Sequence, residues 1–261
     1  MRIITIHDRK AIERFLRRNV YLHIYSIGDL DDFFWPYTIW YAGIINDRVC
    51  HIVLIYFGGD TPVVIALCDS EHQLMCDLLV SLRNLLPREF YAHLSLGLVD
   101  VFGSNSILSS YGNHCKMGLT HLISKPCFPD FFVRLNESDT NALIDFYRRS
   151  YPDNWFDARM LETGMYLGYR SNGRLTAVAG VHVYSKRYRV AALGNIATDP
   201  EYRGKGLCKS LTSSLCQELM KTVDCIGLNV QCNNSVAISC YKSVGFEPIA
   251  TYAEYRIRQQ D

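Results

Sequence analysis

The chain has 261 residues, of which 49% are apolar and 20% are charged; this ordinary globular composition excludes a disordered or collagen-like chain. Its 27 Lys and Arg residues nearly balance its 26 Asp and Glu residues, for a formal net charge of +1. That balance gives no electrostatic footprint for a general nucleic-acid-binding protein, so we expect no nucleic-acid partner. The length fits one large domain or two smaller ones.

The first 18 residues, MRIITIHDRKAIERFLRR, lack the apolar core and the small-residue cleavage site of a signal peptide. The longest apolar run, residues 49–57, has the length of a strand and is too short for a membrane span. The ten cysteines are scattered without a CxxC pair, which favours single thiols in a reducing compartment over a disulfide scaffold. We therefore expect a cytoplasmic protein with no membrane partner.

Hydrophobic periodicity predicts helices and strands in the first half of the chain. Asp8 is expected to cap a helix that reaches Arg18, and a second helix is expected over 20–30. The following predictions are strands over 38–45, 49–57 and 62–67, a helix over 70–86, and strands over 90–96 and 116–123. The acidic and aromatic stretch 29–35 fits either a surface that attracts a cationic amine or a turn beside a hydrophobic anchor.

A similar order of elements begins again after prolines at 126 and 129, which indicate a connector near residues 124–131. The predicted elements are a strand over 132–135, helices over 138–150 and 157–162, strands over 165–170, 175–184 and 188–198, a helix over 206–221, a strand over 225–231, a helix over 235–244 and a strand over 246–257. We therefore predict an α+β fold, with a mixed central sheet flanked by helices. Its two domains are expected to span residues 1–124 and 132–261.

The most informative stretch is a predicted strand-to-helix turn within residues 191–221, AALGNIATDPEYRGKGLCKSLTSSLCQELMK. Gly204 and Gly206 lack a Cβ, so backbone N–H groups of this turn can approach a ligand closely. Those N–H groups and the positive end of the helix dipole attract phosphate oxygens, and Arg203 and Lys205 add positive charge. A tight, solvated turn is the alternative interpretation. The stretch matches neither a Walker A loop nor a dinucleotide-binding fingerprint.

A second motif lies downstream, in residues 231–246, QCNNSVAISCYKSVGF. Together the two stretches resemble the GNAT superfamily of acyl-CoA-dependent N-acyltransferases. The acyl-CoA loop of that family reads (Q/R)-x-x-G-x-(G/A), and N-x-x-A-x-x-x-Y-x-x-x-G-F follows after a strand. The matching positions are Gly204, Gly206, Asn234, Ala237, Tyr241, Gly245 and Phe246. The resemblance covers about residues 132–257, and Glu201 departs from the pattern where the family has Gln or Arg.

The resemblance implies a GNAT fold in the C-terminal half and a cofactor site for acetyl-CoA. It also implies a GNAT-like N-terminal half without a cofactor loop, because only the residues CDSE (68–71) lie between the predicted strand and helix there. Backbone amides are implied to hold the pyrophosphate, and a strand end to hold the pantetheine arm. The residues implied are Arg203, Gly204, Lys205, Gly206, Leu207 and Cys208 for the pyrophosphate, and Asn195, Ile196, Ala197 and Thr198 for the arm. No metal is expected.

The implied reaction is direct attack of a primary amine on the acetyl thioester. Tyr241 matches the family position for a general acid that protonates the leaving thiolate and contacts the cofactor; a plain buried aromatic is the alternative. Asn234 is expected beside the cofactor, as a helix N-cap, or both. His182 is a candidate general base or a satisfied core histidine, with Glu162 and a strand-bound water as other bases.

The acceptor is expected to be a small-molecule or peptide amine, and the residues do not specify which. Two alternatives stay open: a longer-chain or glycine N-acyltransferase-like enzyme, and a protein that binds acyl-CoA without catalysis. The sequence leaves the oligomeric state open.

Overall fold

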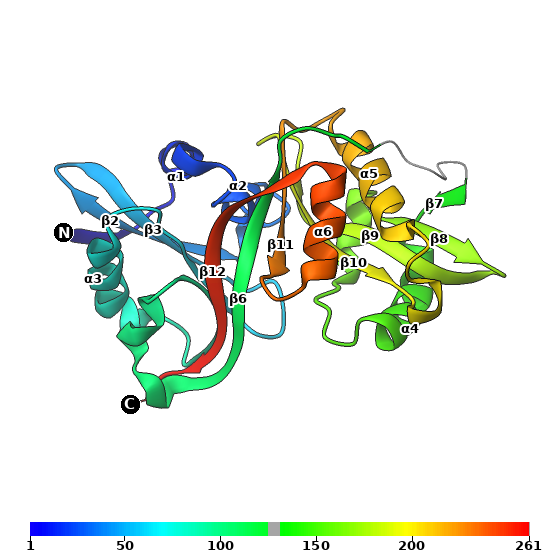
Figure 1. Ribbon diagram of the computed structural model, residues 1–261. Coiled ribbons are helices and arrows are strands. Elements are labelled where there is room, and N and C mark those ends of the chain that lie inside the picture. The colour runs from blue at the N-terminus through cyan, green and yellow to red at the C-terminus, as the bar shows by residue number, and fades with distance from the viewer. Residues whose placement is uncertain (125–130, 261) are drawn as a thin grey trace. The chain divides into compact units, whose positions relative to one another are not determined.

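The computed structural model describes residues 1–124 and 131–260, which divide into two compact units (Figure 1). The first unit comprises Met1–Lys116, Gln231–Asn233 and the chain from Ile249 onward. The second comprises the described part of Met117–Val230 together with Asn234–Pro248. The expected connector lies mostly outside the described residues, so the domain boundary near 124–131 stays a prediction.

The first unit is built on a mixed sheet. Its strands lie in the order β1 (Arg2–Thr5), β2 (Thr38–Ile45), β3 (Arg48–Tyr56), β4 (Val63–Ala66), β5 (Glu89–Ser95) and the C-terminal part of β12 (Phe246–Arg258). Neighbouring strands are antiparallel, except that β4 and β5 are parallel and α3 (His72–Leu82) connects them. Two further helices, α1 (Arg9–Leu16) and α2 (Ile24–Gly28), precede β2.

The core of the first unit lies between α3 and the sheet. One side of the helix buries Met75, Leu78, Leu79 and Leu82 against apolar side chains of the strands. Because parallel strands need a long crossover connection, the burial of this helix also fixes the β4–β5 pairing. Asp8 caps α1 as expected, since its carboxylate accepts from the N–H groups of Lys10 and Ala11.

The strands of the second unit lie in the order β11 (Cys225–Gln231), β10 (Val190–Thr198), β9 (Arg174–Ser185), β8 (Leu167–Ser171) and β7 (Phe132–Arg134). The β10–β11 pair is parallel and is connected by α5 (Leu207–Leu219), whereas the other pairs are antiparallel. The remaining helices are α4 (Thr140–Ser150) and α6 (Ser235–Val244). Strands β6 (Ile107–Leu119) and β12 contribute residues to both units.

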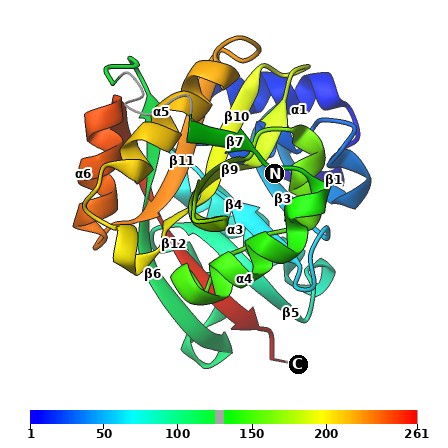
Figure 2. The same ribbon diagram turned by 90° about the vertical axis from the view of Figure 1, so that its right-hand side faces the viewer.

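Helices cover both faces of the strands of the second unit, with α4 and α5 on opposite sides of the β9–β10 pair (Figure 2). Four leucines spaced four residues apart in α5 are 0–5% exposed, and they attach this helix to the sheet: Leu207, Leu211, Leu215 and Leu219. A helix that buries such a stripe is fixed along its whole length, so its N-terminus is held at the end of β10.

Several elements differ from the sequence predictions. The helix expected over 20–30 is shorter, since α2 spans only Ile24–Gly28, and the helix expected over 157–162 is the 3-10 helix Ala158–Thr163. Strand β6 begins at Ile107, well before the expected residue 116. Its first residues are mostly exposed and show no apolar alternation, so periodicity did not indicate a strand there. Strand β1 was not expected, since it has only four residues and none of them is fully buried. Helix α3 begins at His72, after Glu71 in a left-handed conformation, and not at the expected residue 70.

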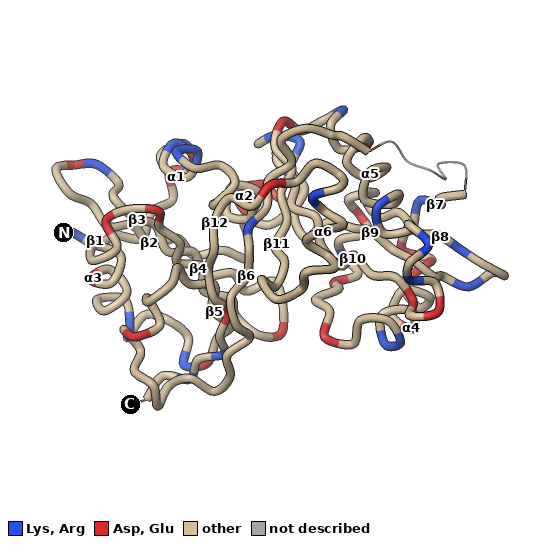
Figure 3. The backbone as a smooth tube through the Cα atoms, in the orientation of Figure 1, with Lys and Arg blue, Asp and Glu red and all other residues tan. Residues whose placement is uncertain are grey.

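Charged residues of both signs are interspersed along the two units (Figure 3). Across residues 1–124 and 131–260, no helix has the length and apolar character that crossing a membrane requires.

Candidate active site

The loop before α5 has the backbone conformation that the two glycines permit. Gly204 and Gly206 have φ values of +76° and +77°, in the left-handed region that favours glycine. A Cβ built on either residue would meet nothing within 4 Å, so the loop faces open space there. The first-turn amides of a helix have no intrahelical acceptor, and Gly206, the N-cap of α5, has no side chain that could cap them.

The strand-to-loop junction is fixed by a buried carboxylate. Asp199, at 4% exposure, accepts from the Glu201 amide at 3.2 Å and from Arg149 Nη1 at 2.6 Å. Arg203 folds back onto the strand, because its Nε donates to the Thr198 carbonyl at 3.2 Å. Its amide donates to the Pro200 carbonyl at 3.4 Å. Arg203 therefore closes the turn. Its amide already donates to a carbonyl of the loop, so Gly204 is the first loop residue whose amide does not.

The end of β10 separates from its parallel neighbour. Pairing with β11 runs from Val190 to Leu193 and stops there. On the other side, the register with β9 shifts between Gly194 and Ala197, and Asn195 has φ +53°. These features form a β-bulge, which redirects the strand and leaves backbone groups unpaired. The stretch 194–198 thus has main-chain groups without a β11 partner in the described structure.

Two buried tyrosines hold this bulge. Tyr147 Oη donates to the Asn195 carbonyl at 2.7 Å, and Tyr166 Oη donates to the Val181 carbonyl at 3.1 Å while accepting from Asn195 Nδ2 at 3.1 Å. Burial raises the pKa of both phenols, so both remain protonated donors. Asn195 Oδ1 is buried and has no hydrogen-bond partner among the described residues.

Neither Tyr147 nor Tyr166 was predicted from the sequence as a functional residue. Tyr147 is on the buried face of α4, Tyr166 directly precedes β8, and the chain has 17 tyrosines, so no local signal separates the two from ordinary core residues. The sequence does give one signal for this bulge: position 195 is an Asn, a residue type that tolerates the positive φ found there.

Helix α6 carries the second motif. Asn234 is its N-cap, with Oδ1 accepting from the Ala237 amide at 3.0 Å, so the capping role is present. Tyr241 is 8% exposed, and its ring lies edge-on to Phe246 with 6.1 Å between centroids. Gly245 has φ +121°, and a Cβ there would lie 1.6 Å from the His121 carbonyl oxygen. The motif glycine is thus required by close backbone packing.

The two candidate general bases, His182 and Glu162, lie in different surroundings. His182, on β9, is half-buried, and its ring covers Gly194: a Cβ on that glycine would lie 1.8 Å from His182 Cδ2. His182 therefore lies beside the start of the bulge, whereas Glu162 is exposed at the end of a short 3-10 helix.

In the stretch 29–35, Asp29 is 6% exposed, and burial raises its pKa to about 8. This carboxyl belongs to the interior and does not form part of an exposed acidic surface.

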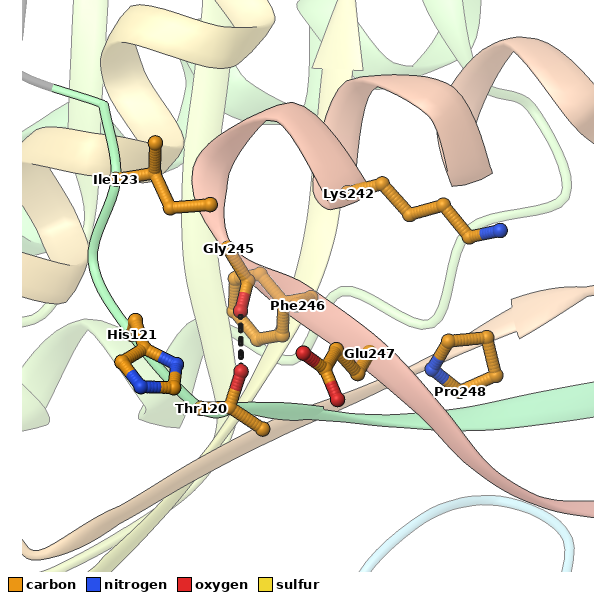
Figure 4. Close-up of a pocket in the computed structure, with 8 residues that line it drawn as sticks. All are labelled: Thr120, His121, Ile123, Lys242, Gly245, Phe246, Glu247 and Pro248. Atoms are coloured by element: carbon orange, nitrogen blue, oxygen red, sulfur yellow. Dashed lines mark hydrogen bonds between the residues drawn. The ribbon is translucent and has the colours of Figure 1, made fainter.

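Two pockets border these elements. A pocket of about 230 Å³ lies at the glycine loop and is lined by Tyr169, Tyr202, Lys205 and Leu207. Lys205 Nζ lies 4.5 Å from the centroid of the Tyr202 ring. A pocket of about 380 Å³ lies at the C-terminal end of α6, where Thr120 Oγ1 donates to the Gly245 carbonyl at 3.3 Å (Figure 4). This second pocket is about 15 Å from the Asn234 end of the ten-residue helix.

The model of the Acetyltransferase (GNAT) family matches residues 130–246, which include the glycine loop, the β10 bulge and α6. The ribosomal protein bS18-alanine N-acetyltransferase of Escherichia coli strain K12 is 30% identical over 126 residues, which cover 46% of this chain and 83% of the relative. The chain belongs to the GNAT family. The expected resemblance of the C-terminal half to GNAT acetyltransferases is therefore confirmed.

Solved structures extend the likeness in fold to the whole chain. An X-ray structure of a Drosophila protein matches with a TM-score of 0.74 at 13% identity, covering 98% of each chain. A tandem GNAT protein from the clavulanic acid biosynthesis pathway matches with a TM-score of 0.59 at 14% identity, covering 100% of this chain and 99% of that one. The expected α+β class, with a GNAT-like N-terminal half, is confirmed. In the first GNAT-like unit, no glycine lies between β4 and α3.

Proposed function

We propose that this GNAT protein transfers the acetyl group of acetyl-CoA to a primary amine, using the second unit. The observation that carries the proposal is the open N-terminus of α5, preceded by two glycines, at the end of a strand that separates from its parallel neighbour. A helix N-terminus without a side-chain cap suits phosphate oxygens. A separated strand end suits an extended molecule that carries amides.

The residues fit the coenzyme in two places. We assign the pyrophosphate to the amides from Gly204 to Cys208, with Lys205 supplying positive charge; the Arg203 amide contributes less because it already donates to Pro200. We assign the two amides of the pantetheine arm to main-chain groups of Asn195–Thr198. The bulge held by Tyr147 keeps those groups in a fixed direction before the coenzyme binds.

The chemistry requires two proton transfers by the protein. An alkylamine has a pKa near 10.4, so at neutral pH it must lose a proton before it can attack. Bound acetyl-CoA supplies the thioester carbonyl that the amine attacks. We assign the donation of a proton to the leaving sulfur to the Tyr241 phenol, and removal of the amine proton to His182 or to a water beside the bulge.

We propose a small-molecule or peptide amine as acceptor. The Escherichia coli relative is named for an alanine of a ribosomal protein, which supports an acceptor of this class. The nine described cysteines are free thiols, which favours the reducing cytoplasm as the location of the reaction.

The test is release of free thiol from acetyl-CoA in the presence of a panel of amines, with benzoyl-CoA and a fatty acyl-CoA as parallel donors. The proposal predicts turnover with acetyl-CoA and at least one amine. Faster turnover with a larger acyl group would instead indicate the longer-chain alternative. Coenzyme binding without turnover on any amine would indicate a non-catalytic acyl-CoA-binding protein.

A further inference from the structure

Two cysteines that neither motif explains meet between α5 and α6. Cys208 is the second residue of α5, and Cys240 on α6 directly precedes Tyr241. The helices pack against each other, and the two Sγ atoms are 3.4 Å apart. Both residues are half-buried, so a small oxidant has access to them.

The two thiols have different acidities. The hydrogen bond with Cys208 and the positive charge of Lys209 lower the pKa of Cys240. The same hydrogen bond, together with burial, raises the pKa of Cys208. The thiolate is the reactive form of a cysteine, so we expect the more acidic Cys240 to react first with an oxidant; Cys208 Sγ, 3.4 Å away, is placed to react second.

We propose that Cys208 and Cys240 are a reversible oxidation site, at which hydrogen peroxide forms a disulfide that weakens coenzyme binding. The Cys240 thiolate attacks one peroxide oxygen and breaks the O–O bond, giving a sulfenic acid and hydroxide, which takes up a proton to form water. The Cys208 sulfur then attacks the Cys240 sulfur, forms the S–S bond and expels a second water. Two thiols are oxidised while one peroxide is reduced to two waters.

The effect on the coenzyme follows from position and rests on the proposed function. A disulfide bond is about 2.05 Å long, so the sulfurs must approach by more than 1 Å from their present separation of 3.4 Å. Cys208 lies in the helical turn whose amides we assign to the pyrophosphate. Formation of the disulfide bond draws that helical turn toward α6, so its amides no longer point at the position we assign to the pyrophosphate. By linkage, bound acetyl-CoA must then disfavour the disulfide to the same degree.

The first unit contains a second close pair of thiols, with Cys115 Sγ and Cys232 Sγ 3.3 Å apart. Burial and the hydrogen bond to Cys115 raise the pKa of Cys232 to about 11. Because Cys232 is exposed, peroxide can reach this pair as well. The substitution Cys232→Ser therefore removes the pair from the experiment. The Cys232→Ser protein retains the Cys208–Cys240 pair and is the reference.

The modification is tested by treating the reference protein with hydrogen peroxide, blocking remaining thiols and mapping peptides by mass spectrometry. The proposal predicts a peptide pair joined through Cys208 and Cys240, which dithiothreitol separates, and its loss in the Cys232→Ser, Cys240→Ser protein. Acetyl-CoA present during oxidation should slow the appearance of the linked pair. Unlinked Cys208 and Cys240 after oxidation would overturn the proposal.

The functional half is tested by titrating acetyl-CoA, which has no free thiol to reduce a disulfide, into reduced and oxidised reference protein. We expect about 10-fold weaker binding after oxidation and full recovery with dithiothreitol. Peroxide should leave the affinity of the Cys232→Ser, Cys240→Ser protein unchanged. A linked pair with unchanged affinity would overturn the coupling to the coenzyme. If the reduced protein bound no acetyl-CoA, the proposed function and this coupling would both fail, and the peptide map would still decide the disulfide.

Discussion

Tyr241 is one of several buried tyrosines of the second unit, and its assignment as general acid depends on the motif in which it lies. We predict that Tyr241→Phe lowers kcat about 10²-fold, because the leaving sulfur loses its proton donor, while the Kd for acetyl-CoA stays unchanged. Tyr184→Phe is the matched control, since Tyr184 is similarly buried and its Oη lies 2.9 Å from Thr222 Oγ1. Steady-state kinetics and calorimetry measure the two quantities. Equal kcat in both variants would remove Tyr241 from the mechanism.

Asp29 gives a pH dependence of stability. Burial raises its pKa from 3.8 to about 8, so between these pH values the folded protein holds a proton that the unfolded chain has released. This contribution to the free energy of unfolding is therefore full at low pH and decreases as pH rises from about 4 to 8. We predict that Asp29→Asn reduces this decrease, measured as urea midpoints at pH 5 and pH 8. A variant with the same pH response as the parent would contradict the assignment.

A motif marks single residues as candidates in the sequence, whereas no motif marks residues that only the fold brings together. The glycines of the loop, Asn234 and Tyr241 belong to spaced patterns that a sequence displays. The contact of Tyr147 with the Asn195 carbonyl joins residues 48 positions apart and is visible only in three dimensions.

At the scale of elements, Gly245 decides how α6 meets β12. A Cβ there would overlap the His121 carbonyl oxygen, and φ is +121°. We predict that Gly245→Ala lowers the free energy of unfolding by about 3 kcal/mol. Gly173→Ala is the control, because Gly173 also has a positive φ but open space around it, and should cost about 1 kcal/mol. Chemical denaturation measures both, and equal losses would show that φ alone accounts for the effect.

Elements with a buried stripe or alternation were predicted closely. The expected ranges 225–231 and 235–244 coincide with β11 and α6, because apolar periodicity and the Asn234 cap mark their ends. Strand β6 escaped prediction over residues 107–115, since hydrogen bonding to neighbouring strands, and not hydrophobicity, makes that exposed segment a strand. The bulge in β10 likewise depends on register, which sequence does not display.

At the scale of the whole molecule, the end of the chain completes the first unit. Residues Tyr252–Arg258 of β12 pair with β5, and Gln259 Nε2 donates to the Arg83, Leu86 and Pro87 carbonyls. Periodicity predicted a last strand but placed it with the C-terminal half, because a pattern along the chain does not specify which distant strand becomes the partner. The fold class was predictable, whereas this pairing was not.

A truncation tests that pairing. We predict that ending the chain at residue 248 unfolds the first unit, because β5 loses a neighbour and buried Phe90 and Leu94 become exposed to water. Limited proteolysis should then cut within residues 1–116. Removing only Gln260 and Asp261 is the control and should leave the proteolysis pattern unchanged. An intact first unit after truncation at 248 would contradict the observed pairing.

The central claim is that the amides of the glycine loop bind acetyl-CoA, and calorimetric titration of acetyl-CoA into the protein tests it most directly. We predict micromolar binding that Gly204→Asp abolishes, because a carboxylate would face the pyrophosphate. Gly204→Asn is the matched control: it has the same shape without the charge and tolerates a positive φ, so it should retain most of the affinity. Binding that Gly204→Asp leaves unchanged, or no binding by the parent protein, would contradict the claim.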